Sequence, residues 1–132
     1  MVRTTRMGQT GIRAILRHPL EPELKLELRQ QLRAYDSLEE EAKALAAERN
    51  WHLKKSNTML ERMIEHMTWM KLGKKDRISN IADMMIQGNT QGMISSLRDN
   101  HRLAEKDQKL QKLNEKLIAL ETENIRQMKP FL

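Results

Sequence analysis

Residues 78–97 carry the strongest structural signal in the sequence. Read at steps of three and four, one set of positions falls on a single face of a helix: Ile78, Ala82, Met85, Asn89, Gly92 and Ser96. Gly88 and Gly92 lie one turn apart in this stretch. A glycine costs a helix interior about 1 kcal/mol relative to alanine, so two of them need a compensating reason. We expect close packing at both glycines and a central position for this helix.

The composition favours a single all-α domain over residues 1–132. Charged residues make up 32% of the chain and aromatic residues only 3%. These proportions are typical of helical proteins rich in Leu, Met, Glu, Lys and Arg. The absence of cysteine excludes disulfides, thiolate metal sites and cysteine nucleophiles. Because there is neither a secretory signal nor an apolar run approaching ~20 residues, we expect a soluble cytoplasmic protein without membrane contact.

Periodicity predicts four main helices, near residues 22–48, 57–72, 77–100 and 105–128, and a short basic helix before Pro19. Pro22 suits the first turn of a helix, and Pro130 ends the last one. No heptad repeat is long enough for a rod, so the helices are expected to turn back on one another. We therefore predict an antiparallel four-helix bundle formed by residues 21–132, with residues 1–20 as an additional helix.

The net charge of +6 is unevenly distributed along the chain. Residues 1–20 hold four arginines and no acid, and residues 50–77 hold seven basic and three acidic side chains. The second block contains a basic patch: Lys54, Lys55, Lys71, Lys74, Lys75 and Arg77. Such a patch can contact phosphate or an acidic partner. We favour the simpler interpretation of a solvated surface, since charge alone supports only non-specific binding.

Asn89 and Asn124 are amides on two otherwise apolar stripes, the second within the helix predicted over 105–128. A buried amide needs hydrogen-bond partners, and two facing amides can satisfy each other while fixing the register of their helices. We favour this structural role over ligand binding. The predicted helix-packing residues are therefore Gly88, Asn89, Gly92 and Asn124.

A four-helix bundle raises the question of a di-iron site, which uses inward-facing glutamates and Glu-x-x-His motifs. This chain contains no Glu-x-x-His. Glu39, His66 and Glu121 are the candidates for a non-standard site. The sequence also lacks a phosphate-binding glycine loop, zinc-ligand spacing and a nucleophile elbow. We expect no catalytic residue, no bound metal and no cofactor.

Three parts of the sequence together resemble a family of small, uncharacterised bacterial helical proteins. They are residues 81–92 (Ile-Ala-Asp-Met-Met-Ile-Gln-Gly-Asn-Thr-Gln-Gly), residues 32–35 leading into 40–42, and residues 121–125 followed by 129–132. The resemblance extends over residues 8–132 and implies a ferritin-like four-helix bundle. It implies no activity, because that family has no activity that can be named.

The sequence therefore leaves several classes of function open. The favoured hypothesis is a non-enzymatic helical bundle that acts through protein–protein contact or self-association. The alternative is a ferritin-like metal-binding protein or oxidoreductase with non-standard ligands. A weaker alternative is nucleic-acid binding through residues 54–77 and the arginines of residues 1–20.

Overall fold

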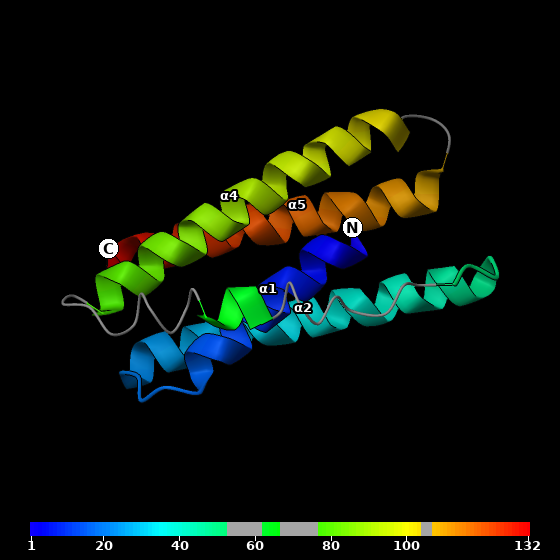
Figure 1. Cartoon of the computed structure of the whole chain (residues 1–132). Coiled ribbons are helices and arrows are strands. Elements are labelled where there is room, and N and C mark those ends of the chain that lie inside the picture. The colour runs from blue at the N-terminus through cyan, green and yellow to red at the C-terminus, as the bar shows by residue number, and fades with distance from the viewer. Residues whose placement is uncertain (53–61, 67–76, 104–106) are drawn as a thin grey trace.

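The computed structural model describes residues 1–52, 62–66, 77–103 and 107–132, and all regular elements within them are helical. They are α1 (Val2–Leu16), α2 (Pro22–Glu48), α4 (Arg77–Leu103), α5 (Gln108–Met128) and the short 3₁₀ helix η1 (Lys129–Phe131) (Figure 1). The prediction of an all-α fold is confirmed for these residues. The ends of α2, α4 and α5 lie within about three residues of those predicted. Apart from the helical residues 62–66, the helix predicted over 57–72 lies outside the described residues.

The four long helices form two antiparallel pairs. α1 packs along α2, and α4 packs along α5 (Figure 1). The pairs meet where α2 contacts α5 and α1 contacts α4. The 3₁₀ helix η1 folds back against both α4 and α5. Each long helix therefore has two long helices as neighbours, and their apolar faces share one interior.

α2 ends through a backbone motif that needs a left-handed residue. Asn50 has a φ of 55°. Its N–H donates to the carbonyl of Ala47 at 3.2 Å, and the N–H of Trp51 donates to the carbonyl of Ala46 at 2.8 Å. These are the paired hydrogen bonds of a Schellman motif, and asparagine tolerates the left-handed conformation better than most residues.

Asp107 starts α5 and also joins it to the end of α2. Its carboxylate accepts a hydrogen bond from the backbone N–H of Leu110 at 3.2 Å, which caps the helix N-terminus. The same carboxylate pairs with the guanidinium of Arg49, the residue that follows α2. This pair places the beginning of α5 beside the C-terminal end of α2.

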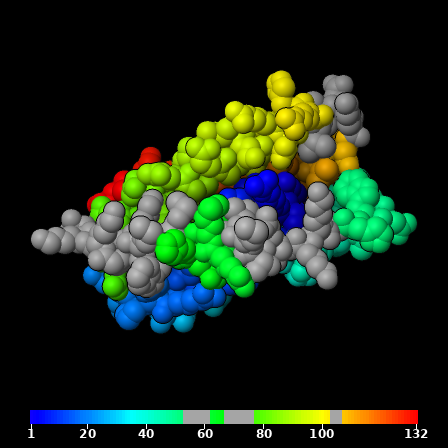
Figure 2. All heavy atoms as spheres, viewed as in Figure 1, coloured from blue at the N-terminus to red at the C-terminus, as the bar shows by residue number. Residues whose placement is uncertain are grey.

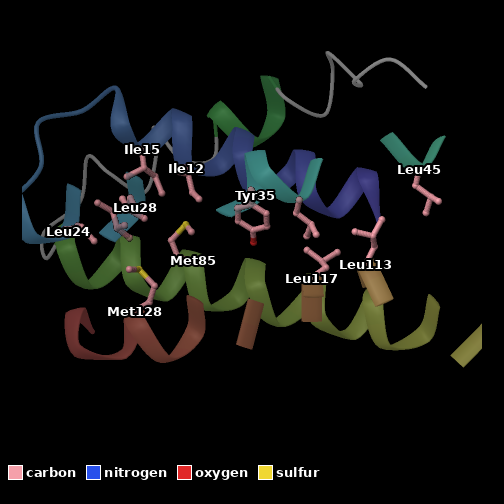
Figure 3. Packing of buried hydrophobic residues seen from close by; sticks show 12 residues of the cluster. Ile12, Ile15, Leu24, Leu28, Tyr35, Leu45, Met85, Leu113, Leu117 and Met128 are labelled. Atoms are coloured by element: carbon pink, nitrogen blue, oxygen red, sulfur yellow. The ribbon is translucent and has the colours of Figure 1, made fainter. Parts of the chain in front are cut away.

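The apolar interior runs along the four helices. Figure 3 shows Ile15, Leu24 and Leu28 towards one end and Leu113 towards the other, with Tyr35 between them. All of these side chains are buried. None of the described helices is long and apolar enough to cross a membrane.

The N-terminal helix has a larger role in the core than its sequence suggests. Ile12 and Ile15 of α1 are fully buried against the other helices. The inward face of α1 also carries Thr5 and Gln9, both buried, and Gln9 donates to the carboxylate of Asp36 at 2.8 Å. Because polar residues occupy part of its inward face, the apolar periodicity of this helix is weak. The expectation of a separate additional helix therefore understates its packing.

We expect Gly8 and Gly11 to respond in opposite ways to alanine. A Cβ at Gly8 would lie 2.5–2.9 Å from the ring and hydroxyl of Tyr35, whereas one at Gly11 meets nothing within 4 Å among the described residues. Gly8→Ala should therefore lower the free energy of unfolding by about 1–3 kcal/mol. Gly11→Ala should raise it by up to about 1 kcal/mol through helix propensity. Urea unfolding of both variants tests this, and a Gly8→Ala protein as stable as the parent would contradict the packing described.

Candidate functional site

Three helices meet at a buried hydrogen-bonded group of Tyr35, Asn89 and Asn124. The Tyr35 hydroxyl on α2 donates to Oδ1 of Asn89 on α4 at 2.9 Å. Nδ2 of Asn124 on α5 donates to the same oxygen at 3.1 Å. Nδ2 of Asn89 donates to the carbonyl of Met85 at 2.7 Å. The predicted contact between Asn89 and Asn124 is confirmed, and we call these three side chains the central polar group.

Tyr35 is held in place from two sides. Its hydroxyl is bonded to Asn89, and its ring lies where a side chain at Gly8 would be. Burial raises the pKa of this hydroxyl well above its ordinary value, and the nearby Glu121 carboxylate raises it further. A hydrogen bond involving Asn124 acts in the opposite direction on the same pKa. Tyr35 is therefore a neutral donor near pH 7, not a source of phenolate.

Glu121 carries a carboxyl group that is buried in the interior. It is only 1% exposed, and its carboxyl group packs against Gly92 of α4. A Cβ at Gly92 would lie 2.8 Å from Cδ of Glu121 and still closer to both carboxyl oxygens. Burial raises the pKa of Glu121 to about 8. Among the described residues, Oε1 of Glu121 has no hydrogen-bond partner.

A second polar contact joins α4 and α5 nearer their connection. Nδ2 of Asn114 donates to the backbone carbonyl of Ser96 at 2.7 Å. Both residues are buried. The Ser96 hydroxyl and Oδ1 of Asn114 have no partner among the described residues, nor does Oδ1 of Asn100, one turn after Ser96. The α4–α5 interface therefore holds several oxygen atoms whose hydrogen bonding is incomplete.

The candidate metal ligands do not converge. Glu39 on α2 pairs with Arg6 at 3.8 Å and with Lys43 at 3.2 Å. His66 is exposed at the end of residues 62–66, and Glu121 is buried on α5. Within the ranges that the structure describes, no three His, Cys, Asp or Glu side chains are grouped so as to hold a metal ion.

Of the predicted basic patch, only Arg77 lies within the described residues. Its Nη1 donates to the carbonyl of Pro19 at 3.3 Å, which links the start of α4 to the α1–α2 connection. A cavity of about 510 Å³ opens beside it, lined in part by Leu20, Ile78 and Phe131. Lys54, Lys55, Lys71, Lys74 and Lys75 fall outside the described residues.

The two glycines predicted to be packing points differ. Gly92 lies in tight contact with Glu121, so that prediction is confirmed. The prediction for Gly88 is wrong, because this residue is exposed and a Cβ there would meet nothing within 4 Å in the described part of the chain. A step of four residues turns a helix by about 40° past a full turn, which is enough to separate the two glycines across the edge of the buried face.

The contact between Gly8 and Tyr35 was not predicted. Tyr35 lies on the apolar stripe of the helix predicted over 22–48, so its burial could be expected from periodicity. Gly8 gives no comparable signal, because a glycine in a weakly periodic helix indicates only reduced helix propensity.

Comparisons with known proteins give no relative for this chain. No family model matches it, and neither the curated proteins nor the solved structures include one that resembles it significantly. The ferritin-like resemblance therefore stays a prediction from the sequence.

Alanine at the two α4 glycines should separate their roles. Gly88→Ala adds a methyl group at an exposed position and should raise the free energy of unfolding by up to about 1 kcal/mol. Gly92→Ala must displace the carboxyl end of the buried Glu121 side chain, so it should give a less stable protein than Gly88→Ala does. Thermal or urea unfolding of the matched pair measures both changes. A Gly92→Ala protein as stable as the Gly88→Ala protein would show that Glu121 can leave this contact at no cost.

Proposed function

We propose that the protein is a non-enzymatic helical bundle that acts by self-association through one surface of the α4–α5 pair. This surface, the outer α4–α5 face, consists of two rows of uncharged side chains: Ile86, Thr90, Met93, Ile94 and Leu97 on α4, and Ile118, Thr122 and Ile125 on α5. On α4 the row follows helical spacing on the flank away from the buried face. The single observation that carries the proposal is the exposure of Ile94 and Leu97 within this face, on a helix that is otherwise well packed.

The two rows lie side by side. The Thr122 hydroxyl donates to Sδ of Met93 at 3.2 Å, which brings the middle of α5 against the middle of α4. Leu97 is 51% exposed and Ile94 is 38% exposed. α4 lies along the outer edge of the molecule, above α1 and α2 in the space-filling view (Figure 2). Exposed apolar side chains that lie together on a small protein can mark a contact with another protein.

A second copy of the chain is the occupant that the charges favour. Asp83 precedes Thr90 by seven residues and Arg98 follows it by eight, and both charged side chains are exposed. If two α4 helices pack antiparallel about Thr90, each Asp83 lies opposite the Arg98 of the other copy. An isologous interface needs this self-complementarity, because the same patch occurs on both partners. Like charges would instead face each other in a parallel arrangement.

The proposal also covers the type of helical bundle and the location of the protein in the cell. We infer an antiparallel four-helix bundle of the ferritin-like type in a cytoplasmic bacterial protein. Support comes from the packing of each long helix against two others and from the sequence resemblance at residues 81–92. In this arrangement α1 is one of the four helices.

Self-association should be lost when a charge is placed in the outer α4–α5 face. Leu97→Glu should weaken the dimer at least about tenfold, because it buries a carboxylate in an apolar contact. Leu26→Glu is the matched control, since Leu26 is 60% exposed on α2, away from this face. Sedimentation velocity over a concentration series measures both. A parent protein that stays monomeric throughout, or equal effects of the two substitutions, would contradict the proposal.

Exchange of the flanking charges tests the antiparallel arrangement. Asp83→Arg and Arg98→Asp should each weaken the dimer, because each places like charges opposite each other. The double variant restores opposite charges and should recover most of the affinity. Failure of the double variant to recover would exclude the proposed pairing.

A further inference from the structure

Four buried oxygen atoms on α4 and α5 have no hydrogen-bond partner among the described residues. They are Oγ of Ser96, Oδ1 of Asn100, Oδ1 of Asn114 and Oε1 of Glu121. Buried polar atoms in native proteins are nearly always hydrogen-bonded, to protein or to ordered water. We therefore expect these atoms on two packed helices to meet donors other than the side chains around them.

These atoms follow the length of the interface. Gly92 lies opposite Glu121, and Ser96 lies opposite Asn114. Asn100 is one further turn along α4, towards the connection to α5. The eight residues from Gly92 to Asn100 span about 12 Å of helix. We call this line of four side chains the interface row.

Water is the donor that fits the neutral part of the interface row. Amide and hydroxyl oxygens of Ser96, Asn100 and Asn114 each accept hydrogen bonds, and a buried water molecule typically makes about three. The amide group of Asn114 cannot rotate to help, because its Nδ2 already donates to the Ser96 carbonyl. Internal water can therefore connect these three side chains to one another.

Water alone does not offset the cost of burying the Glu121 carboxyl group in its ionised form. Within the described residues no cation forms an ion pair with it, and burying an unpaired carboxylate is costly. A proton removes that cost. We propose that Glu121 is a proton-binding site in the α4–α5 interface, connected by internal water along the interface row, and that loss of its proton destabilises the packing of α5 on α4.

Three basic groups on the neighbouring helices pair with carboxylates other than Glu121. Arg6 of α1 pairs with Glu39, and the amino group of Met1 pairs with Asp99 of α4 at 3.7 Å. From α2, Tyr35 faces Glu121 and is itself a neutral group near pH 7. On α5, Lys116 pairs with Glu41 of α2 at 2.6 Å.

The direction of the pH dependence follows from the burial of Glu121. Burial raises its pKa from 4.5 to about 8, so the folded protein holds the proton more tightly than the unfolded chain does. The resulting stabilisation is complete below pH about 4.5, is lost progressively as the pH rises, and is gone above pH about 8.

Carboxyl NMR of the unmodified protein tests the proton site directly. With ¹³C-labelled glutamate, the Glu121 resonance, assigned by its absence from Glu121→Gln, should titrate with a midpoint near pH 8. A midpoint near 4.5 would overturn the proposal. Water is tested on the same sample through nuclear Overhauser effects between water and the side-chain amide protons of Asn114, and their absence would exclude the water-filled row.

A matched pair of variants tests whether ionisation of Glu121 destabilises the packing of α5 on α4. Glu121→Gln should remove most of the decrease in unfolding free energy between pH about 5 and 8, because the amide cannot ionise. Glu115→Gln makes the same chemical change at an exposed position of α5 and should leave the decrease as in the parent. If Glu121→Gln retains the full pH dependence, or Glu115→Gln abolishes it, the destabilising effect does not come from Glu121.

Discussion

The interior of this protein depends on one acceptor, Oδ1 of Asn89. It receives hydrogen bonds from Tyr35 on α2 and from Asn124 on α5, so a single atom of α4 orients three helices. A hydrogen bond contributes only about 0.5–1.5 kcal/mol, but an unpaired buried donor costs about 1–3 kcal/mol. A shift of any of the three helices by one turn would leave such groups unpaired. Apolar packing alone tolerates alternative registers more readily.

The neighbouring glycines make room for these polar groups. Gly8 allows the Tyr35 ring to approach α1, and Gly92 allows the Glu121 carboxyl group to approach α4. Each contact explains why a glycine occupies its position, although glycine destabilises the helix that contains it. The interior therefore combines apolar layers, which supply most of the burial, with polar layers, which restrict how the helices fit together.

Much of this arrangement could be predicted from residue spacing, and the remainder depends on contacts between helices. The helix at 77–100 and the pairing of Asn89 with Asn124 were predicted, because amides on apolar stripes need partners. Residue spacing could not predict that Gly92 is covered and Gly88 is not. Spacing gives the approximate face of the helix on which a residue lies, but not the side chain that packs against it. The position of Glu121 near the seam of the last helix makes it a candidate metal ligand in the sequence, whereas its burial against Gly92 depends on how α5 lies along α4.

A double-mutant cycle on Tyr35 and Asn89 tests the central polar group most directly. Unfolding free energies of Tyr35→Phe, Asn89→Leu and the double variant should show a coupling of about 0.5–3 kcal/mol, because each substitution removes the same hydrogen bond. The control cycle of Tyr35→Phe with Asn114→Leu should be additive within about 0.5 kcal/mol, since Asn114 takes no part in this group. Additivity between Tyr35 and Asn89 would contradict the account, because it would mean that α2 and α4 are aligned by apolar packing alone.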